Sequence, residues 1–378
     1  MRDIPLFKVF CAPASVEAIA EIMSTGYIGQ GPKVDEFEKL LGSRFDEPKV
    51  VTVNSGTSAE HLALHLLKKP HGKWQGMQRG DTVLATPLTC FATNAPILAN
   101  GYKIKWVDVD PETLNMDMGD LERKIGPDTK AIMVVHWGGA PVDLDRLAKI
   151  QEKSLHTWGF KPAVIEDCAH AFGSTYKSKS VGFTGNLSTF SFQAIKHLTC
   201  GDGGMLVCPN RDLYTRAKLL RWYGMDREGT QKDMRCQNDV EEYGFKFHMN
   251  DINACIGIEN LKHVNNLLHV HLENAEYYDA NLPEGLATEV LDDTTSSYWL
   301  YTLRVRNRES FMAALADKGI TTSRVHERND IYSCVNEFKS FLPNLDIVGD
   351  EIVCIPVGWW VTPEDREYIV DTIKQGWI

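Results

Sequence analysis

No run of about 18 apolar residues, the length a membrane-crossing helix needs, occurs in the sequence, although 43% of its 378 residues are hydrophobic. The first residues also lack the hydrophobic stretch of a signal peptide. Cysteine and histidine pairs at zinc-binding spacing are missing, and so are long blocks of lysine and arginine. We therefore expect a cytoplasmic protein with no metal and with neither nucleic acid nor membrane as a partner.

The net charge and the cysteines indicate what kind of substrate and which cellular compartment to expect. The formal net charge is −11 and is spread along the chain, so an anionic substrate needs local basic side chains. The nine cysteines are scattered and mostly lie within apolar patterns, which predicts free thiols in a reducing compartment. The chain is long enough to form two domains with full hydrophobic cores.

Short runs typical of β-strands recur through the first two-thirds of the chain. Helical patterns such as residues 144–153 lie between several of them, which is typical of a mostly parallel sheet with crossover helices. The expected strands are residues 82–86, 103–108, 131–136, 163–166, 188–192 and 205–208. We predict a large α/β domain over residues 1–245, whose N-terminal segment is a candidate for packing on the second domain.

The last third of the chain follows a different pattern. Residues 226–243 are polar and aperiodic and predict a surface excursion, and apolar residues from 252 to 268 predict one long helix. Strand-like stretches 298–305 and 352–356, a helix ending at Gly319 and a final helix with Thr362 as its N-cap follow. We predict a smaller C-terminal α+β domain over residues 246–378.

Lys196 and Asp167 carry the strongest chemical signal. Lys196 follows a hydroxyl-rich strand-like stretch and precedes a glycine-rich turn, whereas Asp167 ends an apolar strand, where α/β sheets place their ligands. A pyridine aldehyde needs an amine to form a Schiff base and an acid to keep the ring nitrogen protonated. Together they predict the cofactor pyridoxal 5'-phosphate (PLP). Each residue taken singly has another interpretation. A lone lysine near glycines is usually a solvated side chain, and a lone aspartate can be a helix cap or a loop acid.

Three weaker signals are consistent with this cofactor. Gly56 and Thr57 precede a helical pattern, and free N–H groups at a helix N-terminus bind phosphate, although a simple cap is the alternative. His170 is a candidate hydrogen-bond partner of the cofactor's phenolic oxygen, or a core histidine. Phe91 is a candidate for stacking on the pyridine ring, or a core aromatic residue.

Together, the motifs of this chain resemble the DegT/StrS-type sugar aminotransferases, PLP enzymes of the aspartate-aminotransferase fold (fold type I). The resemblance runs from about Gly26 to the C-terminal helix. Its landmarks, unspecific singly but informative in this order, are residues 26–32, 54–57, 80–83, 107–111, 166–173, 191–196 and 201–204.

The resemblance implies a role for each matching residue. Lys196 is the implied catalytic residue and forms the Schiff base, Asp167 pairs with the ring nitrogen, and Ser191 joins the helix N-terminus in binding phosphate. The resemblance also implies a homodimer whose active sites are shared, with Lys246 or His248 where relatives place a second-subunit asparagine. The implied cofactor-binding residues are Gly56, Thr57, Phe91, Asp167, His170, Ser191, Lys196, Lys246 and His248.

The implied reaction moves an amino group from L-glutamate onto a keto sugar, which we expect to be nucleotide-linked. The family's pocket loops make Tyr27, Tyr223, Arg324 and His326 the candidates for substrate binding. Arg324 is a candidate for binding a carboxylate or a phosphate of the substrate. The alternative is that it is an ordinary surface arginine. Two other functions stay open, a PLP-dependent sugar dehydratase and a catalytically silent PLP-binding regulator. Lys196 disfavours the dehydratase because similar dehydratases carry histidine at this position.

Overall fold

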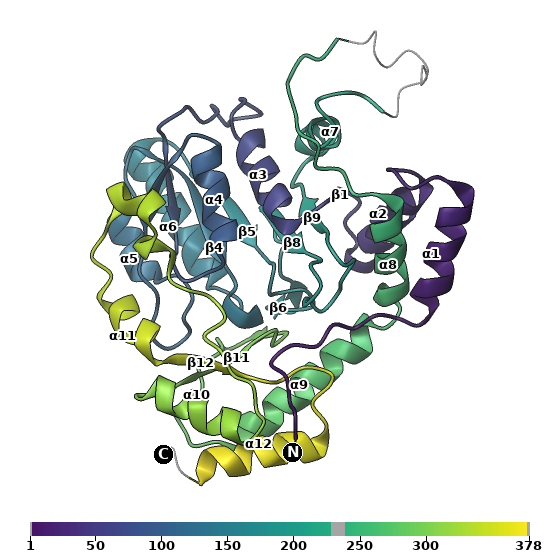
Figure 1. Ribbon diagram of the computed structural model, residues 1–378. Coiled ribbons are helices and arrows are strands. Elements are labelled where there is room, and N and C mark those ends of the chain that lie inside the picture. Colours follow the sequence, from purple (N-terminus) through teal and green to yellow (C-terminus); the bar gives the residue numbers. More distant parts are fainter. Residues whose placement is uncertain (1, 228–238, 376–378) are drawn as a thin grey trace.

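A seven-stranded sheet forms the centre of the computed structural model, which describes residues 2–227 and 239–375 (Figure 1). The strands lie in the order β1-β9-β8-β5-β4-β2-β3. Strand β9 runs antiparallel to both neighbours, and the other strands run parallel to one another. Their bounds are β1 (Val50–Val53), β2 (Thr82–Ala85), β3 (Lys103–Trp106), β4 (Thr129–Val135), β5 (Ala163–Asp167), β8 (Leu187–Ser191) and β9 (Gly204–Val207).

The predicted α/β architecture with a mostly parallel sheet is confirmed. All six expected strands are present, with bounds that differ by at most two residues from the prediction. Strand β1 was not predicted. Its four residues are all buried, so they show no alternation of polar and apolar side chains, and a short apolar run does not distinguish strand from helix.

Helices cover both faces of the sheet. Successive side chains of a strand point to opposite faces, and the central strands carry apolar side chains on both, so each face needs its own cover. In β2, Val83 and Ala85 join the core under α3 (Gly56–Leu66), α4 (Phe91–Ala99) and α7 (Arg211–Leu220). Leu84 joins the opposite core, under α5 (Met118–Lys124) and α6 (Leu144–Trp158). A third core contains residues of β8, β9, α2 (Pro32–Phe45) and α8 (Asp251–Leu261).

The single long helix predicted from residue 252 onward is wrong. The structure has two helices there, α8 and α9 (Val264–Asn281), with Lys262 and His263 between them. The apolar spacing continues almost unchanged across this break, so the sequence pattern did not reveal it. Helix α8 packs on α1 (Ala14–Thr25) and α2, whereas α9 runs toward the C-terminal elements (Figure 1). The domain boundary at residue 245 stays a prediction.

The C-terminal elements build a separate core around a two-stranded sheet. Its elements are β11 (Tyr301–Arg304), β12 (Ile352–Ile355), α10 (Arg308–Asp317), α11 (Pro343–Glu351) and α12 (Pro363–Lys374). Helix α12 begins as predicted, with the Thr362 hydroxyl accepting a hydrogen bond from the Asp365 N–H at 3.1 Å. The N-terminal segment lies alongside, since the Ile4 N–H donates to the Gly319 carbonyl at 2.8 Å.

The remaining regular elements are short. They are strands β6 (Thr175–Tyr176), β7 (Lys179–Ser180) and β10 (Thr294–Thr295), and 3-10 turns at Trp137–Gly139, Asn329–Ile331 and Ser333–Phe338. Most of the excursion predicted for residues 226–243 lies outside the described residues. Within residues 2–227 and 239–375, every helix is too short or too polar to cross a bilayer.

Gly204, the first residue of β9, lets the sheet approach the start of α3 closely. A Cβ atom at this position would lie 2.6 Å from the Ser55 carbonyl carbon and 2.7 Å from the Gly56 nitrogen. Because both atoms belong to the backbone, we expect Gly204→Ala to lower the free energy of unfolding by roughly 1–3 kcal/mol. Thermal unfolding measures this loss. The control is Gly349→Ala, whose nearest neighbour is 4.0 Å away; equal midpoints for the two variants would contradict the account.

Candidate active site

The parallel strands end around one cavity of about 690 Å³. In a parallel sheet the carboxyl ends of the strands share one edge, so residues that follow different strands meet there. The ends of β5 and β8, the start of α3 and the segment 321–326 all contribute to its wall. The predicted site residues that line it are Gly56, Thr57, Asp167, His170, Ser191, Lys196 and His326.

Lys196 places its amine inside this cavity. Its Nζ atom lies 3.4 Å from the centroid of the Trp299 ring, and within the described part of the chain it has no hydrogen-bond partner. Burial lowers the pKa of Lys196 to about 7, against the opposing charge of Asp167. A substantial fraction of the amine is therefore neutral near pH 7, and a neutral amine is nucleophilic.

Asp167 faces the cavity from the end of β5 and is held by two donors. The Thr93 hydroxyl donates to Oδ2 at 2.7 Å, and the Ala169 N–H donates to Oδ1 at 2.9 Å. Hydrogen bonds donated to a carboxylate stabilise its charged form and fix its direction. The side chain is thus arranged to meet a cationic group in the cavity.

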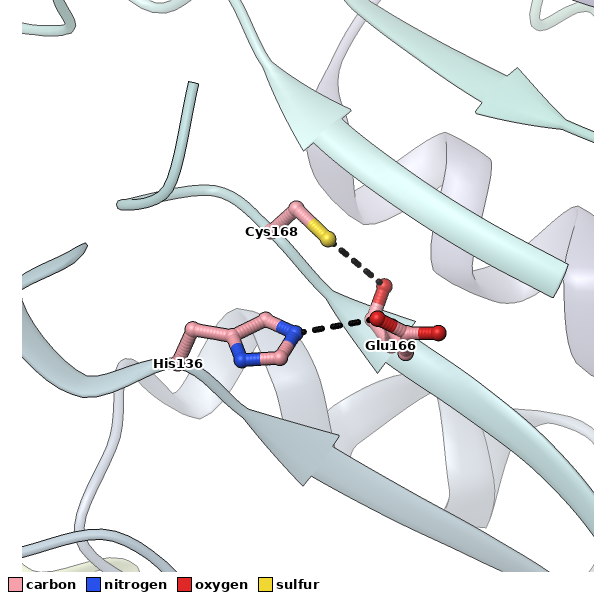
Figure 2. Close-up of side chains that lie close together, drawn as sticks. All are labelled: His136, Glu166 and Cys168. Atoms are coloured by element: carbon pink, nitrogen blue, oxygen red, sulfur yellow. Dashed lines mark hydrogen bonds and ion pairs between the residues drawn. The ribbon is translucent and has the colours of Figure 1, made fainter. Parts of the chain in front are cut away.

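A buried polar cluster holds the strand that carries Asp167 (Figure 2). The Val142 N–H donates to His136 Nδ1, so the His136 proton sits on Nε2 and is donated to Glu166 Oε2 at 3.2 Å. Asn186 and Thr184 donate to the other oxygen of Glu166. Burial raises the pKa of Glu166, but these hydrogen bonds outweigh it and hold the value below the ordinary one.

The cluster of Figure 2 also contains the ligand types of a metal site, because the Cys168 thiol lies within 4.8 Å of His136 and Glu166. The polar atoms already bond to protein, however, and the thiol faces the Glu166 carbonyl at 3.7 Å. We therefore interpret the cluster as a structural support that fixes the ends of β4 and β5 beside the cavity.

The start of α3 forms the second side of the cavity. Ser55 is the N-cap and accepts a hydrogen bond from the Ser58 N–H at 3.1 Å, so the helix begins at Gly56. A Cβ atom on Gly56 would lie 3.0 Å from the Ser191 Cβ, which shows how closely β8 approaches the helix end. The N–H groups of Gly56 and Thr57 have no partner within the described residues, and such groups bind anions.

Two stacked imidazoles form the third side. The rings of His170 and His326 are nearly parallel, at 4°, and their Nε2 atoms lie 3.4 Å apart. Burial, and then the charge of Lys196, lower the pKa of His170 well below its ordinary value and that of His326 to about 3. Both rings are therefore neutral, and one donates to the other. His170 Nδ1 is buried without a partner in the described chain and is available to a ligand.

The structure does not bring Phe91 to the cavity. Its ring packs edge-on against Tyr332, with centroids 5.1 Å apart, and belongs to the core under α4. Phe91 is the first residue of α4, and its neighbours Cys90 and Thr93 line the cavity instead. Successive helical residues point about 100° apart, so a shift of one position decides which side chain enters the site.

Five other candidates lie outside the cavity of the single chain. Lys246 and His248 lie beside Trp222, with His248 and Trp222 ring centroids 3.8 Å apart. The Arg324 guanidinium pairs with Glu327 at 2.6 Å. Tyr27 and Tyr223 are exposed. Their roles stay predictions, and those of Lys246 and His248 depend on the homodimer that the family resemblance implies.

The residues that line the cavity but were not predicted from the sequence include Glu60, Cys90, Thr93 and Trp299. Glu60 gave one usable signal, because it is the one acidic residue in the mostly apolar helical pattern of residues 59–67. Trp299 gave none, because it lies far along the chain in a stretch that predicts an ordinary strand. Its ring contacts Lys196 and stacks on His170 at 3.9 Å between centroids.

The cavity fits PLP. An unpaired helix N-terminus beside Ser191 suits the phosphate, and the buried amine of Lys196 suits the aldehyde. The carboxylate of Asp167 suits a protonated ring nitrogen, and the unpartnered Nδ1 of His170 suits a polar ring substituent.

Comparisons with known proteins agree with this assignment. The sequence profile of the DegT/DnrJ/EryC1/StrS aminotransferase family matches residues 12–374. AtS13 from Actinomadura melliaura is 49% identical, with a TM-score of 0.94 and complete coverage of both chains. The sugar aminotransferase CalS13 from Micromonospora echinospora is 46% identical, with a TM-score of 0.93 over 99% of this chain and 100% of that one.

A more distant solved structure is also similar over nearly its whole length. Spr1654 from Streptococcus pneumoniae, solved in a PMP form, is 25% identical, with a TM-score of 0.89 over 98% of each chain. The fold predicted from the sequence, fold type I with a mostly parallel sheet, is confirmed by these neighbours.

Proposed function

The chain belongs to the DegT/DnrJ/EryC1/StrS aminotransferase family, and we propose that it moves an amino group from L-glutamate onto a nucleotide-linked keto sugar. It is a PLP-dependent transaminase that acts on sugars. The nucleotide and the glutamate donor are our proposal. One observation carries it: a buried amine and a hydrogen-bonded carboxylate, Lys196 and Asp167, share a cavity with a helix N-terminus.

When bound, PLP supplies the carbonyl group that takes up an amine and the ring that withdraws electrons from it. We propose that Lys196 holds the cofactor through Nζ and, once released, moves protons near it, because a pKa of about 7 suits both tasks. Asp167 provides the negative charge that keeps a ring nitrogen protonated. The Gly56 and Thr57 N–H groups and the Ser191 hydroxyl hold the phosphate.

The finer proposals concern the assembly and the substrate. We propose a cytoplasmic homodimer in which Lys246 or His248 of each chain reaches the other chain's phosphate site. Both residues lie outside the cavity of their own chain, beside Trp222, which is consistent with such a role. We keep Tyr27, Tyr223, Arg324 and His326 as substrate-binding candidates, of which His326 lines the cavity.

A substrate panel tests the proposed reaction. The purified enzyme is incubated with PLP, L-glutamate and each of several nucleotide-linked keto sugars, and both amino sugar and 2-oxoglutarate are quantified. We expect the two products in equal amounts with at least one sugar, and much less product with L-aspartate or L-alanine as donor. Product from free keto sugars alone would contradict the nucleotide-linked substrate.

The lowered pKa of Lys196 predicts an unusual pH dependence of its reactivity. Only the neutral amine reacts with an acylating or arylating reagent, so in the PLP-free protein its labelling should rise with pH through a midpoint near 7. The hydrogen bond to Asp145 raises the pKa of the exposed Lys177, so its labelling midpoint should lie above the ordinary lysine value of about 10.4. Peptide mass spectrometry after timed labelling gives both curves from one sample. A Lys196 midpoint as high as that of Lys177 would contradict the buried amine.

A further inference from the structure

Glu60 is an acidic residue inside the cavity that the proposed mechanism does not use. It lies in the second turn of α3, is 2% exposed, and shares the cavity wall with Asp167 and Lys196. Within the described residues it forms no ion pair, and its Oε2 atom is buried without a hydrogen-bond partner. An ionised carboxylate left in this state would carry a large desolvation cost.

The groups that face Glu60 come from three elements. Asp167 lies at the end of β5, Cys90 precedes α4, and Lys196 follows β8. Burial, followed by the negative charge of Asp167, raises the pKa of Glu60 well above its ordinary value. Two neighbouring carboxylates avoid ionising together, and one of them then keeps a proton. Asp167 already has two donors, so the proton belongs on Glu60.

We propose that Glu60 is a positioning residue whose carboxyl group stays protonated and donates its proton as a hydrogen bond to Asp167, so that the two acids present a single negative charge to PLP. The inference rests on the proposed role of Asp167. As a donor, Glu60 stabilises the Asp167 anion, whereas an ionised Glu60 would repel it. The side chain acts through Asp167 and not on the substrate.

A neutral Glu60 also serves Lys196. Burial lowers the pKa of Lys196, and nearby negative charges oppose it, that of Asp167 most and that of Glu60 less, so a protonated Glu60 leaves a larger fraction of the amine neutral. With Glu60 protonated, Asp167 is the main opposing charge. The proton on Glu60 thus helps to keep Asp167 ionised and the amine of Lys196 partly uncharged near pH 7.

Two variants of Glu60 separate the hydrogen-bond donor from the charge. Glu60→Gln keeps the size and a donor but cannot ionise, whereas Glu60→Leu keeps the bulk and removes the donor. PLP affinity of the full-length PLP-free protein is measured by titration between pH 5 and 9 for wild type and both variants (a range of roughly two units either side of neutrality). The Lys196 labelling midpoint is measured in parallel.

We expect Glu60→Gln to follow the wild type in both measurements. Glu60→Leu should bind PLP roughly tenfold more weakly, because a hydrogen bond to a charged group is lost. Its loss of affinity on acidification should begin roughly one pH unit higher, since the Asp167 anion is less stabilised. An unchanged Glu60→Leu curve, or equal shifts in both variants, would overturn the proposal.

Infrared spectroscopy provides a second measurement in case Glu60→Leu does not fold. The carbonyl stretch of a protonated carboxyl group should be present in the wild type at pH 7 and absent from Glu60→Gln. Its absence from the wild type, or its persistence in Glu60→Gln, would refute the assignment. None of these measurements uses a sugar substrate, and the labelling and infrared measurements do not need PLP. A wrong proposed function, for example no attachment of PLP to Lys196, is therefore distinguishable from a wrong role for Glu60.

Discussion

Lys196→Ala is expected to lower amino transfer by at least about 10²–10⁴-fold, the range that a positioned acid–base group contributes. The variant loses both the covalent hold on PLP and the group that moves protons beside it. Steady-state assays with glutamate and the accepted sugar measure the loss. The fold should remain, because the amine has no hydrogen-bond partner within the described residues, and its removal leaves no such partner unsatisfied.

Two controls make the Lys196 result specific. A small primary amine added to Lys196→Ala should restore part of the activity, because it supplies the missing amine in the vacated space. Lys177→Ala removes an exposed lysine that pairs with Asp145 on the surface and should leave turnover unchanged. Near-normal turnover of Lys196→Ala without added amine would refute the role of this residue.

Asp167→Asn is expected to reduce turnover by about 10²–10³-fold, the usual effect of removing one preorganised electrostatic partner. Asparagine has the shape of aspartate but no negative charge. A ring nitrogen opposite it would therefore no longer be stabilised in its protonated form. PLP affinity should fall as well. The unfolding midpoint should change little, because the amide oxygen still accepts the hydrogen bond from either Thr93 or Ala169.

Thr93→Val is the matched control for Asp167→Asn. It removes one hydrogen bond to the carboxylate and leaves the charge in place, so turnover should fall only about tenfold. If Thr93→Val were as damaging as Asp167→Asn, the orientation of Asp167 rather than its charge would be the important property. Full activity in Asp167→Asn would exclude its electronic role altogether.

The meeting of Lys196, Asp167, Ser191 and Gly56 at one cavity could be predicted from the sequence. Asp167, Ser191 and Lys196 lie at or after the ends of predicted strands, and parallel strands bring their carboxyl ends to one edge of the sheet. Gly56 was predicted from a different signal, the start of a helical pattern. The type of these residues and their positions relative to the predicted elements were therefore enough to predict that they meet. The same logic did not extend to Lys246 and His248, whose proposed target lies in the partner subunit.

Other features depended on geometry that a local pattern does not contain. Phe91 and Cys90 differ by one position at the start of α4, and only the direction of the helix decides which side chain enters the cavity. Trp299 reaches Lys196 from the C-terminal part of the chain through tertiary packing alone. Glu60 is the one acidic residue in the helical pattern of residues 59–67, but the sequence did not show that it lies next to Asp167.

The central claim is that PLP is attached to Lys196 within this cavity. The most direct test is to reduce the purified enzyme with borohydride in the presence of PLP, digest it and map the modified peptide by mass spectrometry. The account predicts the added mass of the reduced cofactor on Lys196 and its loss in Lys196→Ala. Attachment to a different lysine, or no attachment under conditions that support amino transfer, would contradict it.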